Sequence, residues 1–175
     1  MKLNSRRTIL TGLAFLSICA FWQMYDSVIP LILTKTFHMN ETFSGAIMAA
    51  DNVLALFLLP FFGARSDKTN TKIGKRMPYI LFGTGCAVIL MNLLPLMDNS
   101  YAAAPSGFKT ASFVIVLGLL LIAMGTYRSA AVALMPDLTP KPLRSRANAI
   151  INLMGAVGGI LYLAVAAILY SQKRL

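Results

Sequence analysis

Residues 111–136, ASFVIVLGLLLIAMGTYRSAAVALMP, decide the fold class, because Arg128 is the only charged side chain in this long apolar run. At a rise of about 1.5 Å per residue, a helix of this length crosses a hydrocarbon core of about 30 Å. A helix also satisfies its own backbone hydrogen bonds, which lipid cannot do. The stretch therefore predicts a transmembrane helix.

Four further stretches have the same character, at residues 9–33, 43–63, 78–97 and 148–170. Hydrophobic residues make up 57% of the chain and charged residues 13%, against about a quarter charged in a soluble domain. The first stretch is too long for the core of a signal peptide, so we predict a retained helix. The sequence thus predicts an all-α membrane protein with five transmembrane helices.

The net charge of +10 is placed as membrane insertion requires rather than as nucleic-acid binding requires. Alternate connections are basic: Lys2, Arg6, Arg7; Arg65, Lys68, Lys72, Lys75, Arg76; and Lys141, Arg144, Arg146. The opposite connections hold only Lys35 and Lys109. The positive-inside rule then predicts a cytoplasmic N-terminus and accounts for the basic clusters without a nucleic-acid partner. We expect the protein in the cell (plasma) membrane.

Three ionisable residues fall well inside the predicted spans: Asp26, Asp51 and Arg128. Each costs roughly 2.5–3.5 kcal/mol near a helix centre. Such groups are retained where they face a cavity or one another, so we predict that they bind substrate or ion. Asp26 and Asp51 lie at similar depth, about 11–12 Å from the outer ends of their spans. The alternative is structural pairing between helices.

Polar residues on the same helices extend this set. Gln23 shares a face with Asp26, Asn52 follows Asp51, and Asn152 lies on the fifth span in line with Gly155 and Gly159. We predict that Gln23, Asn52 and Asn152 line a wet path between helices. Interhelical hydrogen bonds and close packing at the glycines are the structural alternative.

The connection between the second and third spans holds the strongest local motif. It runs Gly63-Ala-Arg-Ser-Asp67-Lys68 and then Lys72-Ile-Gly74-Lys75-Arg76-Met-Pro78. A topogenic loop explains the basic residues but not the glycines and the aspartate. The loop resembles the signature of the major facilitator superfamily, Gly-x-x-x-Asp-Arg/Lys followed by Gly-Arg/Lys-Arg/Lys, which Gly63, Asp67, Lys68, Gly74, Lys75 and Arg76 match.

Two details resemble particular branches of that superfamily. The spacer at residues 69–73 is longer than the common form, and the next basic connection runs Pro136-Asp137-Leu-Thr-Pro140-Lys-Pro-Leu-Arg144. Both are similar to the sucrose–proton symporters and the glycoside–pentoside–hexuronide cation symporters. The resemblance covers nearly the whole chain, as helices 1–5 of a twelve-helix transporter, within its N-terminal six-helix bundle.

The resemblance also implies roles. The first loop (Gly63, Asp67, Lys68, Gly74, Lys75 and Arg76) and the second (Asp137 and Arg144) would gate access by contacting the C-terminal half. Asp51 falls in the part of helix 2 where the melibiose-permease branch binds its coupling cation. Arg128 departs from that branch, which carries an Asp there, so a melibiose-like, sodium-coupled role is disfavoured.

We therefore predict proton-coupled symport of a sugar or glycoside, in which Asp51 or Asp26 loses and gains the proton. The implied partners are the lipid bilayer, a small-molecule solute, a coupling cation and a missing C-terminal half. We expect a chain that ends early and is inactive alone. The alternatives are a complete five-span protein, and a non-transporting fragment or half-transporter that needs a partner chain.

An enzyme is not expected, because the only histidine, His38, lies in a connection and no catalytic or metal-ligand spacing is present. Cys19 and Cys86 fall inside spans, where packing is the usual role of a free thiol. The sequence therefore predicts no metal and no cofactor.

Overall fold

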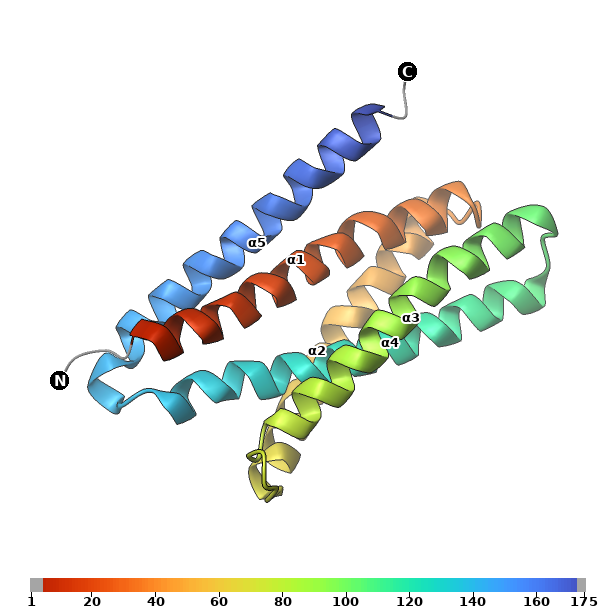
Figure 1. The fold of residues 1–175 in the computed structure, drawn as a ribbon. Helices are drawn as coiled ribbons and strands as arrows, with labels where there is room; N and C mark the ends of the chain where they lie inside the picture. Colours follow the sequence, from red (N-terminus) through yellow and green to blue (C-terminus); the bar gives the residue numbers. More distant parts are fainter. Residues whose placement is uncertain (1–4, 173–175) are drawn as a thin grey trace. The chain divides into compact units, whose positions relative to one another are not determined.

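The computed structural model describes the backbone of residues 5–172 and the side chains of residues 8–50 and 52–169. Within this part of the chain, the elements are α1 (Ser5–Lys35), α2 (Glu41–Lys68), α3 (Met77–Ala103), α4 (Gly107–Leu138), the 3-10 turn η1 (Lys141–Leu143) and α5 (Arg144–Gln172) (Figure 1). Five helices there are long and apolar enough to cross a membrane. The all-α membrane fold class is confirmed.

The helices extend past the apolar stretches that predict them, because side chains at the membrane surface also support helix. Four prolines near the ends of spans, Pro30, Pro60, Pro95 and Pro136, lie inside α1 to α4 rather than ending them. The polar residues and turn formers at 98–110 predict a loop, but α3 continues to Ala103 and α4 begins at Gly107. Lys109 Nζ donates to the Ser100 carbonyl at 2.7 Å and so stabilises the end of α3.

The chain forms two compact units, and the first contains residues 5–28 and 131–172 of the described part. In this unit α5 runs alongside the first part of α1 (Figure 1). Glycines of α5 allow the contact: a Cβ at Gly158 would overlap the carbonyl of Leu16, and one at Gly155 would lie 2.9 Å from Cys19 Sγ. Without a hydrophobic driving force between helices in lipid, such small residues permit close backbone packing.

The second unit spans residues 29–130 and contains α2, α3 and most of α4. Here α3 packs closely on α4 at Gly83, where a Cβ would lie 2.9 Å from the Tyr127 nitrogen. Phe37 stacks on Tyr101 with ring centroids 4.2 Å apart and contacts Phe113 at 4.6 Å. These contacts hold α3 and α4 together within the second unit.

Candidate functional site

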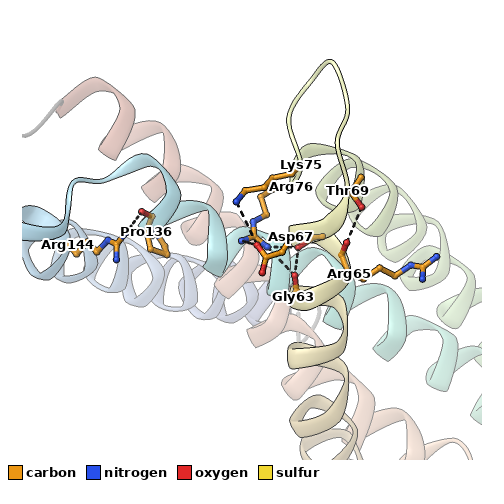
Figure 2. Close-up of polar contacts among 9 residues, drawn as sticks. Gly63, Arg65, Asp67, Thr69, Lys75, Arg76, Pro136 and Arg144 are labelled. Carbon is orange, nitrogen blue, oxygen red and sulfur yellow. Dashed lines mark hydrogen bonds and ion pairs between the residues drawn. The ribbon is translucent and has the colours of Figure 1, made fainter.

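The loop that joins α2 to α3 is organised around Arg76, which lies at the N-terminal boundary of α3. Its Nη2 donates to Asp67 Oδ1 at 2.5 Å, and its Nη1 donates to Ser66 Oγ at 2.5 Å and to the Gly63 carbonyl at 3.3 Å (Figure 2). Arg76 is 5% exposed. A buried guanidinium is tolerated where its donors are satisfied and a carboxylate faces it. Arg76 thus ties the last turns of α2 to the start of α3.

Asp67 also forms an ion pair with a second basic side chain, that of Lys75. Lys75 Nζ lies 3.7 Å from Asp67 Oδ1, and the side chains of Lys75 and Asp67 are 43% and 54% exposed (Figure 2). An ion pair this exposed contributes little stability. Asp67 is therefore anchored from one side by Arg76 while part of its carboxylate stays open to solvent or to another protein surface.

The turn before these residues depends on a glycine. Gly74 has φ +100°, a conformation that side chains rarely adopt. Its N–H donates to the Thr71 carbonyl at 3.0 Å, and Thr71 Oγ1 donates to the Gly74 carbonyl at 2.6 Å. Gly74 closes the turn that delivers Lys75 and Arg76 to Asp67.

Sequence reasoning missed three residues of this site. Ser66, fully buried, bridges Arg76 and the Gly63 carbonyl, to which its hydroxyl donates at 2.9 Å. Thr69, which caps α2, shares a 2.9 Å hydrogen bond with the hydroxyl of Tyr79 on α3. The sequence could have indicated Ser66, because a residue three positions after Gly63 lies on the same helix face as this motif glycine.

The second basic connection lies in the first unit and has a different geometry. Arg144 Nη2 donates to the Pro136 carbonyl at 3.0 Å (Figure 2). Its Nε donates to the Thr139 carbonyl at 3.3 Å. The last carbonyls of a helix have no partner within it, so Arg144 caps the end of α4. Asp137 is exposed beside this cap.

Three of the predicted intramembrane residues lie in the first unit: Gln23 and Asp26 on α1, and Asn152 on α5. Gln23 Nε2 donates to Ser27 Oγ at 3.5 Å, and a Cβ at Gly159 would lie 3.7 Å from Gln23 Oε1. The polar stripe of α1 therefore faces the glycine stripe of α5 in the stretch that includes Gln23. Asp26 and Asn152 are exposed in this chain.

The other predicted intramembrane residues lie in the second unit. Asn52 is exposed and donates from Nδ2 to the Met48 carbonyl of its own helix at 3.3 Å. Arg128 is half-buried on α4. Asp51 lies on α2, but its side chain is outside the described residues.

The structure thus brings four predicted loop residues together, Gly63, Asp67, Lys75 and Arg76, with Gly74 shaping the turn. Lys68 is exposed at the end of α2. Among the side chains that the structure describes, no group of three His, Cys, Asp or Glu residues could hold a metal ion. The site is an ion-paired, hydrogen-bonded loop at the junction of α2 and α3.

The family follows from the comparison with known protein families. The model described as Major Facilitator Superfamily matches residues 11–173, nearly the whole chain. The chain belongs to the major facilitator superfamily. The resemblance found in the first loop is confirmed, and the family together with the five apolar helices makes the chain a multi-pass membrane protein.

Relatives within the superfamily are partly similar to the chain. The sucrose transport protein SUC3 of Arabidopsis thaliana is 33% identical over 139 residues, which is 73% of this chain and 23% of the relative. The sucrose transport protein SUT3 of Oryza sativa subsp. japonica is 28% identical over 170 residues, 87% of this chain and 33% of the relative. The putative transporter YdfJ of Escherichia coli (strain K12) is 34% identical over 95 residues, 51% of this chain and 21% of the relative.

The chain therefore spans between about a fifth and a third of the length of these relatives. No solved structure matches it.

Proposed function

We propose that the chain is the N-terminal part of a secondary transporter that takes up a sugar or glycoside together with a proton. The observation that best supports this proposal is the similarity of the chain to two proteins named sucrose transport proteins, over 73% and 87% of its length. Sucrose is accordingly the first substrate to test. The names of these relatives support the substrate class but not a particular substrate, because less than half of each relative is matched.

Three charged residues supply the coupling chemistry in this proposal. Asp51 or Asp26 binds and releases the proton, since a carboxylate is kept inside a membrane span where an ion or solute passes it. Arg128 orients the substrate or biases the charge state of that carboxylate. Gln23, Asn52 and Asn152 offer hydrogen-bond partners for sugar hydroxyls.

The loop site acts as the gate. Arg76 is buried and donates hydrogen bonds within the chain, whereas about half of the Asp67 side chain is exposed. Lys68 and Lys75 are exposed beside Asp67. We assign the contact with the opposing half of the transporter to Asp67 and these lysines, and the shaping of the loop to Gly63, Gly74 and Arg76. In the second basic connection, Arg144 holds the end of α4 and Asp137 provides a second exposed acid.

Orientation follows from the charge distribution. The basic connections carry the loop site, so the proposal places the N-terminus and this gate in the cytoplasm and the protein in the plasma membrane. The remaining helices come from a C-terminal half outside this chain, because alternating access moves one bundle against another. Residues 1–175 alone are then inactive.

The test is uptake of radiolabelled sucrose by proteoliposomes that contain the longer transporter of which this chain forms the start. An inward proton gradient should drive accumulation, and a protonophore should abolish it. A panel with maltose and an aryl glucoside reports the substrate class. Uptake that ignores the proton gradient would contradict coupling, and failure to carry every sugar of the panel would contradict the substrate class.

A second candidate is a half-transporter that functions only with a partner chain. The observation that favours it is the share of each relative that this chain covers, a third or less. Co-expression of residues 1–175 with a separately encoded second half should then restore sucrose uptake, while either chain alone should give none. Uptake by residues 1–175 alone would refute both candidates.

A further inference from the structure

A buried serine connects α4 to α2 one residue beyond Arg128. Ser129 is 6% exposed, and its Oγ donates to the Leu59 carbonyl at 2.6 Å. Leu59 directly precedes Pro60, which has no N–H and so removes one backbone hydrogen bond from α2 at this turn. Ser129 therefore attaches α4 to α2 beside the turn in which Pro60 leaves α2 one backbone hydrogen bond short.

Two glycines make room for this attachment. A Cβ at Gly63 would lie 3.3 Å from Ser129 Oγ, and a Cβ at Gly125 would lie 3.4 Å from Leu58 Cβ. Gly125 and Ser129 are one turn apart on α4, so both contacts with α2 come from one face of α4. Arg128 lies between them in the sequence and at the edge of that face.

The same part of α2 is held from α3. The Gly63 carbonyl, one turn after that of Leu59, accepts from Arg76 Nη1 and from Ser66 Oγ. The end of α2 is thus attached to α4 through Ser129 and to α3 through Arg76. A shift of α4 against α2 would have to break the Ser129 bond.

We propose that Ser129 is a positioning residue for Arg128. The inference rests on the proposed transport function, in which Arg128 acts on the substrate or on the coupling carboxylate. The Ser129–Leu59 hydrogen bond fixes the register of α4 against α2, and so fixes the height and direction from which Arg128 acts relative to the helix that carries Asp51. Ser129 itself touches neither substrate nor proton.

A neighbouring threonine provides the matched control. Thr126 is 7% exposed on the same helix, but its Oγ1 donates to the Ile122 carbonyl of α4 itself at 2.7 Å. Thr126→Ala removes a buried hydroxyl of the same kind without detaching α4 from α2. It should leave the KM for sucrose unchanged.

The experiment is a double-mutant cycle between Ser129→Ala and Arg128→Gln, with the KM and kcat of sucrose uptake measured in the longer transporter. Ser129→Ala should raise KM about threefold, the order expected for one interhelical hydrogen bond in a membrane. Ser129→Thr, which keeps the hydroxyl, should raise KM much less than Ser129→Ala does. In the Arg128→Gln background the serine substitution should have no further effect, because a residue that acts through Arg128 has nothing left to position.

The outcomes separate this inference from the proposed function. If Arg128→Gln impairs uptake and Ser129→Ala adds its full effect on top, Ser129 has a merely structural role and the inference is overturned. If Arg128→Gln leaves uptake unchanged, the role of Arg128 fails and the inference fails with it. A stability cycle tests the contact without transport: Gly63→Ala should lower the melting temperature less in the Ser129→Ala background, and equal losses would overturn the contact.

Discussion

Arg76 and Asp67, nine positions apart, form an ion pair with one buried and one exposed member: Arg76 Nη2 lies 2.5 Å from Asp67 Oδ1, and their side chains are 6% and 54% exposed. The cation is fixed by three acceptors, while the anion stays accessible. Within one ion pair, therefore, Arg76 holds the loop and Asp67 can exchange partners.

Arg76→Ala should lower the melting temperature of the transporter in detergent by several degrees. The substitution removes hydrogen bonds to the Gly63 carbonyl, Ser66 Oγ and Asp67, and bonds involving a charged group contribute roughly 1.5–3 kcal/mol. Lys75→Ala is the control, because the exposed pair of Lys75 with Asp67 at 3.7 Å contributes about 0–1 kcal/mol. Equal melting temperatures for the two variants would contradict the anchoring role of Arg76.

Gly74→Ala should also destabilise the loop, by about 1–3 kcal/mol, because an alanine at φ +100° is strained. The turn that presents Lys75 and Arg76 to Asp67 would open. Thermal unfolding followed by size-exclusion fluorescence measures the loss. Gly45→Ala is the control, since Gly45 is helical and a Cβ there meets nothing within 4 Å. A variant at Gly74 as stable as that at Gly45 would show that the turn is not required.

Gly158→Ala tests the packing of the first unit. A Cβ at this position would overlap the carbonyl of Leu16, and backbone atoms cannot rotate away as a side chain can. Overpacking of this kind costs about 1–3 kcal/mol, so α5 should separate from α1 and the melting temperature should fall. Gly118→Ala, where a Cβ meets nothing within 4 Å, should be tolerated. Normal stability of the Gly158 variant would disprove the close α1–α5 contact.

Much of the fold was predictable because lipid imposes one solution on a long apolar run. Residues 111–136 needed only their length and hydrophobicity to indicate a helix, and α4 contains them. The ends were less predictable: the polar residues at 98–103 look like a loop, yet they continue α3. Polar side chains at the membrane surface are compatible with both states, so composition alone does not decide between them.

Only part of the loop site and its surroundings could be predicted from the sequence. Gly63, Asp67 and Arg76 belong to a recognisable motif, whereas Ser66 and Ser129 become important only through what they face. A serine inside a helix usually bonds to its own backbone, as Ser112 does with the Phe108 carbonyl. Only the packing of α4 on α2 distinguishes Ser129 from a serine such as Ser112. The proton-binding roles of Asp26 and Asp51 stay predictions.

Membrane orientation can be tested with single cysteines. After Cys19 and Cys86 are replaced by alanine, Asn70→Cys places a thiol in the loop between α2 and α3, and Ser106→Cys places one between α3 and α4. The positive-inside rule predicts that a membrane-impermeant maleimide labels position 106 in intact cells and position 70 only after lysis. The reverse pattern would place the N-terminus outside and contradict a cytoplasmic gate.

Asp51→Asn should abolish uphill accumulation of sucrose but spare exchange of internal for external sucrose. The amide has the size of the carboxyl group and cannot release a proton, so the carrier can still alternate while loaded but cannot couple to the gradient. Counterflow and gradient-driven uptake in proteoliposomes separate the two activities. Glu41→Gln is the control, because Glu41 lies in the first turn of α2, outside the apolar span. If Asp51→Asn accumulates sucrose normally, the coupling role moves to Asp26, and Asp26→Asn must then show the loss. Normal accumulation by both variants would refute proton coupling through Asp26 and Asp51.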